Sequence, residues 1–269
     1  AQSLAAEIVE DNRRRRQTEA AISQEAMAAI EADPRLRHAR VIVVSCQGWH
    51  HGVVGIVAAR VTERYGKPCF VISEDGAEAR GSGRSVEGFS LFDAVSHCAG
   101  LLTRFGGHPM AAGATMAVEN VGAFRDCINQ YAQTACPRMP AQPLRLDCKL
   151  KPAALSPRLP QDLAPLEPFG SGSPQPVFGL FGMELREITP VGAGAHLRLG
   201  FARDGVSLRC MRFRVRPEEF PYSRGDLLDL AVTLEAKEYR GEEQLNIVVK
   251  DMKPAGLDTE ACINAWQLY

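Results

Sequence analysis

The spacing of apolar residues changes at one proline-rich segment, residues 137–143 (PRMPAQP), and this change constrains the fold most strongly. Before the segment, short apolar runs alternate with stretches of helical periodicity, which is typical of an α/β layer. After it, apolar residues recur at every second position between turn-forming residues, which is typical of a small antiparallel barrel. The 269-residue chain is therefore predicted to be α/β plus all-β.

The predicted domains follow from these patterns. We expect a long linking helix over residues 1–38, an α/β domain over 39–138, a small barrel over 139–256 and a tail over 257–269. The linking helix has no glycine or proline before Pro34. Its apolar residues are spaced for a single stripe: Leu4, Ile8, Ile22, Met27 and Ile30.

The individual elements are predicted by the same periodicities. In the α/β domain we expect strands over 41–46, 69–73 and 111–118, and helices over 52–65, 91–102 and 123–133. The glycine-rich segment 79–85 (ARGSGRS) is interpreted as a loop. In the barrel we expect strands over 144–150, 196–202, 207–215, 227–236 and 244–252, with a turn over 170–176.

Charge and cysteine content exclude several classes. The chain has 31 basic and 32 acidic residues, so no overall field attracts it to nucleic acid or to an anionic membrane. No apolar run approaches the ~20 residues of a membrane span. The eight cysteines are scattered without a C-x-x-C pair, so we expect reduced thiols in a cytoplasmic protein.

The segment GSGRS, residues 81–85, is a candidate phosphate site. Glycines at alternate positions let a ligand approach the backbone, including the amide of Gly83. The Ser82 hydroxyl and the Arg84 guanidinium add donors that suit phosphate. The alternative is a glycine-rich hairpin turn with a solvated arginine.

The segment FGGHPMAAG, residues 105–113, presents His108 on a turn before a strand. Gly106 and Gly107 allow a ligand to approach closely, and an imidazole donates to phosphate or carries a proton near neutral pH. The alternative is a structural turn with a hydrogen-bonded histidine.

The segment QGWHHGVVG, residues 47–55, lies where a strand meets a helix, a position where open α/β sheets often bind ligands. Trp49 is a candidate for stacking on a base, and His50 is a candidate nucleic-acid contact. The alternative for Trp49 is a boundary aromatic that packs over the sheet. His50 and His51 lack carboxylates at ligand spacing and make a poor metal site.

A basic stripe is predicted on the barrel. Strand alternation from residue 207 to 215 places Arg212, Arg214 and Arg216 on one face, with Phe213 and Val215 on the other. The same outward phase is expected for His196 and Arg198, so these residues would form a groove for a polynucleotide backbone. Tyr239 and Arg240 are further nucleic-acid candidates. The alternative is a solvated face balanced by Glu218, Glu219 and Glu235.

Metal-binding motifs are missing from the sequence. Two-metal phosphoryl chemistry needs several convergent carboxylates or histidines. The chain has no D-x-D, D-H-H or H-E-x-x-H pattern. We therefore expect no metal ligands in this chain.

Taken together, the motifs identify a family. The segments GWHHGVVGIVAARVTERYGKP, GSGRS and FGGHPMAAG, in that order, resemble the DHH-associated domain of the RecJ family of bacterial exonucleases, in the DHH phosphoesterase superfamily. VEDNRRRR resembles the family's linking helix. LEPFGSGSPQPVF and EYRGEEQLNIVVKDM resemble its oligonucleotide-binding (OB) barrel. The resemblance covers residues 11–253.

The resemblance implies the C-terminal portion of a 5′→3′ single-stranded-DNA exonuclease of recombination and repair. It implies that Mn²⁺ or Mg²⁺ is held by an N-terminal DHH domain outside this chain. Ser82 and Arg84 match the family's phosphate contacts, and His108 matches its active-site histidine. His51 and Ser173 stand where the family has glutamine or proline and asparagine, respectively. Neither residue belongs to the expected phosphate contacts, but because of Ser173 the resemblance does not define the barrel's entry loop.

The resemblance also implies binding partners, and three other functions are alternatives to it. The expected partners are single-stranded DNA, the DHH domain and, as a further candidate, a single-strand-binding protein. The isolated chain is predicted to be inactive. The rivals are a non-enzymatic single-strand-binding module and a fragment of a DHH-type oligonucleotide phosphodiesterase, or a relative acting on the substrate of alanyl-tRNA synthetase.

Overall fold

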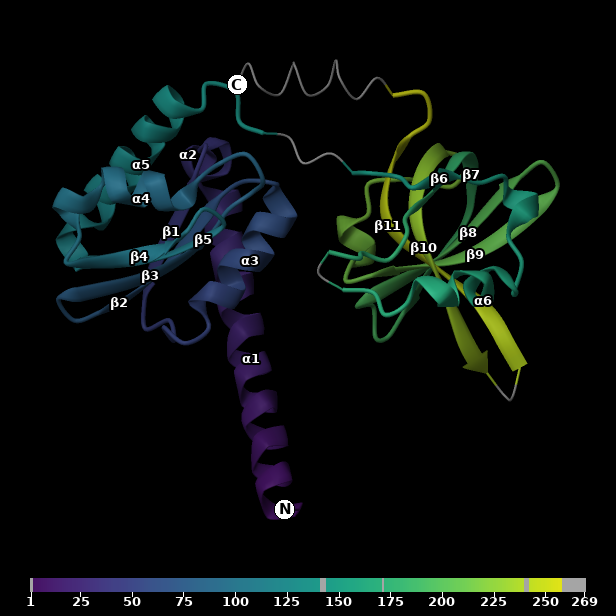
Figure 1. The fold of residues 1–269 in the computed structure, drawn as a ribbon, viewed down its shortest axis with the longest axis horizontal. Helices are drawn as coiled ribbons and strands as arrows, with labels where there is room; N and C mark the ends of the chain where they lie inside the picture. Colours follow the sequence, from purple (N-terminus) through teal and green to yellow (C-terminus); the bar gives the residue numbers. More distant parts are fainter. Residues whose placement is uncertain (1, 141–143, 171, 240–241, 258–269) are drawn as a thin grey trace. The chain divides into compact units, whose positions relative to one another are not determined.

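The chain folds into two compact units that divide between residues 142 and 143 (Figure 1). The computed structural model describes residues 2–140, 144–170, 172–239 and 242–257. The first unit contains a five-stranded sheet with helices, and the second contains a barrel. No helix within these four ranges is long and apolar enough to cross a membrane.

The first unit begins with two consecutive helices. The 31-residue helix α1 (Gln2–Ala32) is followed by the short helix α2 (Pro34–His38). Asp33 separates them because its side chain accepts a hydrogen bond from the Arg35 amide at 2.9 Å and so caps α2. The predicted linking helix over residues 1–38 is therefore two helices.

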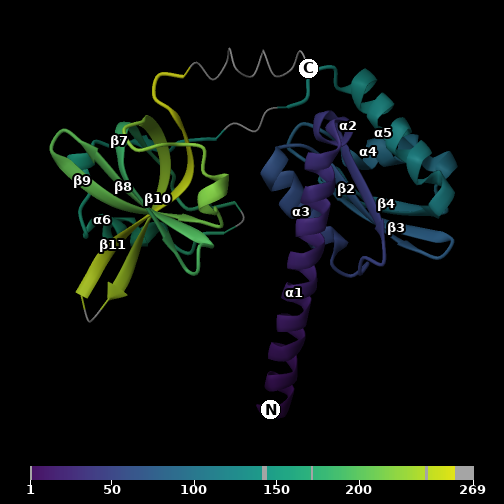
Figure 2. The ribbon, with the colours of Figure 1, turned by 180° about the vertical axis from the view of Figure 1, so that it is seen from behind.

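The apolar stripe of α1 is buried only in its second half. Ile22, Ala26 and Ile30 are four residues apart and buried, so this half packs beside α3 (Figure 2). Leu4 is 61% exposed and Ile8 is 53% exposed. The prediction of one continuous stripe is wrong for the first half, which extends beyond the sheet (Figure 1).

A mixed sheet forms the centre of the first unit. In sheet order its strands are β1 (Ile42–Gln47), β2 (Cys69–Asp75), β3 (Glu78–Arg84), β5 (Ala111–Ala117) and β4 (Arg104–His108). β1 and β2 are parallel, and the other neighbours are antiparallel. The helices that cover the sheet are α3 (Val54–Tyr65), α4 (Leu91–His97) and α5 (Val121–Ala135). The sequence thus predicted all three helices, with shifted ends.

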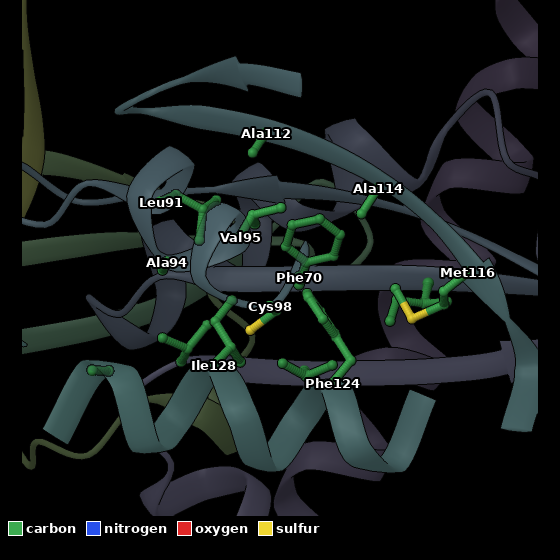
Figure 3. Packing of buried hydrophobic residues seen from close by; sticks show 14 of the residues in the cluster. Phe70, Leu91, Ala94, Val95, Cys98, Ala112, Ala114, Met116, Phe124 and Ile128 are labelled. Atoms are coloured by element: carbon green, nitrogen blue, oxygen red, sulfur yellow. The ribbon is translucent and has the colours of Figure 1, made fainter. Parts of the chain in front are cut away.

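Alternation along the strands builds a core on each face of the sheet. On one face, Ile42 and Val71 pack with residues of α1 and α3. On the other face, Phe70 packs with residues of α4 and α5, including Phe124, whose ring meets that of Phe70 edge to face at 5.3 Å (Figure 3). The face that α3 covers over β2 and β3 carries the candidate site.

The two glycine-rich motifs form strands, which corrects the loop interpretation. GSGR lies within β3, between β2 and β5, and FGGH lies within β4. The glycines of β3 are needed because the Phe70 ring lies over this strand. A Cβ on Gly81 would lie 2.5 Å from the Cε1 atom of Phe70, and a Cβ on Gly83 would lie 2.4 Å from the Cδ2 atom of Phe70. Packing on the core face therefore accounts for the alternate glycines, and the opposite face carries Ser82 and Arg84.

The second unit is a closed barrel. Its strands are β7 (Phe178–Val191), β8 (His196–Arg203), β9 (Val206–Phe213), β10 (Leu227–Tyr239) and β11 (Glu242–Pro254). β7, β8 and β9 are antiparallel neighbours, β11 is parallel to β9, and β10 pairs with both β11 and β7. Among the described residues, this pairing joins the five strands into a ring, as in an OB fold.

Two elements of the second unit were missed in the sequence. β7 breaks the period of two because Gly182 has a φ of +62° and the register shifts between Leu185 and Glu187. The helix α6 (Leu159–Leu163) is only five residues long. Conversely, the strand expected over 144–150 is reduced to β6 (Cys148–Lys149).

Candidate functional site

Arg84 and Ser82 meet beside the first turn of α3. The Arg84 Nη1 atom donates to the Ser82 Oγ atom at 3.2 Å and to the Gly83 carbonyl at 2.8 Å. A Cβ on Gly55 would lie 3.0 Å from Ser82 Oγ and 3.2 Å from Arg84 Nη2. Glycine at the second position of α3 therefore lets both side chains approach the start of the helix.

This arrangement gathers donors around one point. The N-terminus of α3 adds a partial positive charge, and its first turn contains no acidic residue, although the amides of Ile56 and Val57 donate to the Val53 carbonyl. A hydroxyl, a guanidinium and a helix N-terminus together suit a phosphate. Gly55 was not predicted as a site residue, although it ends the GVVG segment and a glycine at the start of a helix is a signal visible in the sequence.

His108 lies on the same face of the sheet as Arg84. Ala111 of β5 is the register partner of Arg84 in β3 and of His108 in β4. Residues paired in this way point to the same side of the sheet. The backbones of Arg84 and His108 are therefore two strand spacings, about 10 Å, apart, with Ala111 between them. The Met110 amide donates to the His108 Nδ1 atom at 3.3 Å. A neutral imidazole in this position carries its proton on Nε2, where it is available to a ligand.

Between Arg84 and His108, this face of the sheet carries small residues. Gly113 of β5 pairs with Ser82 on one side and with Gly106 on the other. A Cβ on Gly106 would meet no atom within 4 Å. All five residues of β4 are exposed. A ligand can therefore lie against the backbone of β5 and β4.

Gly107 has a structural role that is independent of a ligand. Its φ is +150°, and a Cβ there would lie 2.3 Å from the Ala111 carbonyl oxygen. Gly83 is likewise fixed by packing under Phe70. Among the glycines predicted to bind phosphate, Gly106 is the one that faces open space.

Trp49 is buried, which corrects its predicted role in stacking. Its side chain is 6% exposed, and its Nε1 atom donates to Glu25 of α1 at 2.8 Å. Its carbonyl accepts a hydrogen bond from Ser73. The alternative interpretation, a boundary aromatic over the sheet, describes this contact. His50 is exposed, and its ring stacks on that of His51 with centroids 5.3 Å apart.

The predicted basic stripe on the barrel is wrong in its register. Arg212 pairs with Leu197, which points into the barrel core, whereas Arg198 pairs with Met211. Arg198 and Arg212 therefore lie on opposite faces of the sheet. Arg212 donates to the carbonyls of Val249 and Lys250, which fixes it to β11.

The other residues of the stripe lie beyond the strand. β9 ends at Phe213, and Arg214 has a φ of +59°. Arg216 precedes a 3₁₀ turn and lies 4.0 Å from Glu218. Of Tyr239 only the backbone is described, and Arg240 lies outside the described residues.

A different cationic surface lies on the outer face of the barrel. Arg198 of β8 and Arg209 of β9 are exposed around Glu187 of β7. The pKa of Glu187 is lowered, first by a hydrogen bond from Thr189 and then by the nearby charges of these arginines. Phe213 is 43% exposed on the same face. Arg209 and Phe213 were missed because the strand phase had been assigned one residue out of step.

No metal centre is formed by the described part of the chain. Within it, no three His, Cys, Asp or Glu side chains are grouped closely enough to hold an ion. The donors gathered on the sheet face are a hydroxyl, guanidinium groups and an imidazole, which suit an anion. These residues do not fit a two-metal site.

Comparison with known protein families identifies both units. Residues 38–134 match the DHHA1 domain, and residues 146–251 match the RecJ OB domain. Both matches fall on the units that the structure separates, the first on the mixed sheet and the second on the barrel.

The chain is similar to RecJ exonucleases of several bacteria. The single-stranded-DNA-specific exonuclease RecJ of Bacillus subtilis is 31% identical over 275 residues, which cover 100% of this chain and 33% of that protein. RecJ of Thermus thermophilus is 36% identical over 73% of this chain and 28% of that protein. RecJ of Escherichia coli is 28% identical over 94% of this chain and 45% of that protein. The chain thus spans less than half the length of these relatives.

A solved structure agrees with these matches. The crystal structure of Thermus thermophilus RecJ in complex with Mg²⁺ superposes with a TM-score of 0.77 and 30% sequence identity. The superposition covers 95% of this chain and 38% of that one.

Proposed function

Because this chain is the DHHA1 and OB portion of a RecJ-family protein, we propose that it positions the substrate of a 5′→3′ single-stranded-DNA exonuclease of recombination and repair. In this proposal the first unit binds the 5′-terminal phosphate and the barrel binds nucleotides further along the strand. Hydrolysis then starts at an end because the terminal phosphate has its own site. The proposed partners are single-stranded DNA, an N-terminal DHH domain and a single-strand-binding protein, in the cytoplasm.

Ser82 and Arg84 bind the terminal phosphate beside the N-terminus of α3, whose partial positive charge favours an anion. Their mutual hydrogen bond at 3.2 Å holds the hydroxyl and the guanidinium at one point before the ligand arrives. His108 donates from Nε2 to the scissile phosphate, across Ala111. The common pairing of Arg84 and His108 with Ala111 is the observation that carries this proposal.

The barrel contributes a cationic outer face. Arg198 and Arg209 contact the phosphates of the strand, and the exposed ring of Phe213 offers a surface for a base. Arg212 does not take part because it is bound to β11.

The metal ions of the intact enzyme would be held elsewhere. The Thermus thermophilus RecJ structures are complexes with Mg²⁺ and with Mn²⁺. The described residues of this chain do not supply a matching ligand set, so every step assigned to them is binding, orientation or hydrogen bonding. The isolated chain is therefore expected to bind DNA without hydrolysing it, even with added Mn²⁺.

The test compares oligonucleotides that differ only at the 5′ end. The 269-residue chain should bind a 5′-phosphorylated single strand more tightly than the same strand with a 5′-hydroxyl. Arg84→Gln and Ser82→Ala should each remove this preference, whereas Arg35→Gln, at an exposed arginine of α2, should preserve it. Equal binding of both strands by the unmodified chain would contradict the proposal.

A non-enzymatic single-strand-binding module is the second candidate, and the cationic outer face of the barrel favours it. In that case binding would ignore the 5′ end, and Arg84→Gln would change nothing. A phosphodiesterase of short oligonucleotides would instead show strong competition by dinucleotides against longer DNA.

A further inference from the structure

The sulfurs of Cys98 and Cys127 are in direct contact between α4 and α5. The Cys98 thiol donates a hydrogen bond to the Cys127 sulfur, and the two Sγ atoms are 3.0 Å apart. Cys98 directly follows the last residue of α4, and Cys127 lies in the second turn of α5. Figure 3 shows the Cys98 side chain pointing toward α5. Among the seven cysteines that the structure describes, this is the pair whose sulfurs meet.

The position of this pair suits a disulfide. An S–S bond is about 2.05 Å long, so the two sulfurs must approach each other by about 1 Å. Cys98 lies between the end of α4 and the 3₁₀ turn Ala99–Leu101, where the backbone can adjust more easily than inside a helix. One turn further along α5, the Tyr131 ring lies 5.1 Å from the His97 ring. This contact holds the end of α4 against α5 beside the sulfurs.

The two sulfurs differ in their access to solvent. Cys127 is partly exposed, whereas Cys98 is 1% exposed and belongs to the core on this face of the sheet. Burial raises the pKa of the Cys98 thiol, and the hydrogen bond to Cys127 raises it further, so Cys98 stays protonated near neutral pH. An oxidant therefore meets the Cys127 sulfur first. Cys98 is then already in place to attack it, and this proximity offsets the low reactivity of the Cys98 thiol.

We propose that Cys98 and Cys127 are a redox-sensitive pair that hydrogen peroxide or an organic hydroperoxide converts into a disulfide between α4 and α5. In the first step the Cys127 sulfur attacks a peroxide oxygen. An S–O bond forms, the O–O bond breaks, and the thiol proton leaves with the other oxygen as water or alcohol, so that Cys127 becomes a sulfenic acid. In the second step the Cys98 sulfur attacks the Cys127 sulfur. The S–S bond forms, the S–O bond breaks, and the hydroxyl leaves as water with the Cys98 proton. The two thiols together give two electrons and two protons to the peroxide.

The disulfide has two consequences for the first unit. It would close the segment between residues 98 and 127, which contains β4 and β5, and so should stabilise this unit by restricting its unfolded state. It would also keep Cys127 in a form that thiols can reduce, whereas further oxidation to a sulfinic acid is irreversible in most proteins. The pair lies on the face of the sheet opposite Ser82 and Arg84, so the inference does not depend on the proposed function.

The experiment treats the reduced, folded 269-residue chain with hydrogen peroxide, blocks the remaining thiols with N-ethylmaleimide in denaturant, and identifies linked tryptic peptides by mass spectrometry without reduction. Trypsin leaves Cys127 and Cys136 in one peptide, residues 126–138, so the Cys136→Ser chain is used to assign the link. In this chain the peptide with Cys98 should be joined to the peptide with Cys127, with two hydrogen atoms lost, and dithiothreitol should separate them.

Cys127→Ser is the matched variant, because Cys127 and Cys136 are both partly exposed. The Cys127→Ser chain should form no link to Cys98. The oxidised Cys136→Ser chain should unfold about 5–10 °C above its reduced form, whereas peroxide should not raise the unfolding midpoint of the Cys127→Ser chain.

The exposed Cys46 and Cys148 show whether the peroxide has reacted with the chain. If these two thiols are oxidised and no link between Cys98 and Cys127 forms, the proposal is wrong. A link that forms only in denaturant also overturns it. So does a linked chain that unfolds no higher than the reduced chain, because the folded structure then does not present the two sulfurs for bonding.

Discussion

The ring of Phe70 occupies the space that a side chain on Gly83 would need. A Cβ on Gly83 would lie 2.4 Å from Phe70 Cδ2 and 2.6 Å from a methyl group of Leu91. This contact explains why β3 alternates glycine with polar residues. The core face must be bare, and the opposite face is then available for Ser82 and Arg84.

Gly83→Ala is therefore expected to destabilise the first unit by about 1–3 kcal/mol, because the added methyl group overpacks a closed core. Gly122→Ala in α5 is the matched control, since a Cβ there meets nothing within 4 Å. Thermal unfolding of the two variants should show a lower midpoint for Gly83→Ala alone. A stable Gly83→Ala protein would mean that Phe70 moves freely.

Gly55→Ala should separate stability from binding. Gly55 and Gly122 both occupy the second position of a helix after a valine. Alanine there favours the helix by up to about 1 kcal/mol. At Gly55 the new methyl group also meets Ser82 Oγ at 3.0 Å and Arg84 Nη2 at 3.2 Å.

The Gly55→Ala chain should therefore unfold no more easily than the unmodified chain and yet lose its preference for a 5′-phosphate. The Gly122→Ala chain should keep that preference. Binding measured with phosphorylated and hydroxyl strands checks both statements. An unchanged preference in Gly55→Ala would show that the guanidinium does not need this space.

Glu19 joins α1 to α3. Its side chain is 4% exposed and lies between Arg15 of α1, at 2.9 Å, and Arg60 of α3. Glu19→Gln removes the shared anion from two partly exposed arginines, so we expect a loss of about 1–2 kcal/mol in unfolding free energy. Urea denaturation of Glu19→Gln, Arg60→Gln and the double variant measures the coupling. Additive losses in the double variant would contradict a direct Glu19–Arg60 interaction.

Some strands and site residues could be predicted from the sequence, whereas β3 and the common face of the site could not. Continuous apolar runs predicted β1 and β2, because strands buried on both faces leave that signal. The strand β3 gave no such signal because two of its core-facing positions are glycine, and the requirement for glycine comes from the packing of Phe70 in the paired strand β2. The chemistry of Ser82, Arg84 and His108 could be recognised in the sequence, but their common face depends on the register through Ala111.

Thiol reactivity should follow burial. Desolvation raises the pKa of Cys210 to about 12 and raises the pKa of the buried Cys69 as well, so both thiols stay protonated at pH 8. Cys46 and Cys148 are exposed. Brief alkylation of the folded chain at pH 8, followed by mass spectrometry, should modify the exposed pair and spare the buried pair. Equal labelling of all four would show that the cores open on the timescale of the reaction.

Arg198 and Arg212 should give opposite results because they lie on opposite faces of the barrel wall. Arg198 is exposed on the outer face, so Arg198→Gln should weaken binding of single-stranded DNA and reduce the log–log salt slope by about 0.7. Its unfolding midpoint should not change. Arg212 instead donates to carbonyls of β11, so Arg212→Gln should lower the unfolding midpoint of the barrel.

For Arg212→Gln the salt slope of DNA binding should stay at the value of the unmodified chain, measured at a temperature where the variant remains folded. Salt titrations by fluorescence anisotropy and thermal unfolding of the same samples provide both readouts. A reduced slope for Arg212→Gln would assign DNA binding to the end of the barrel near β11. An unchanged slope for Arg198→Gln would remove the outer face of β8 and β9 from the path of the strand.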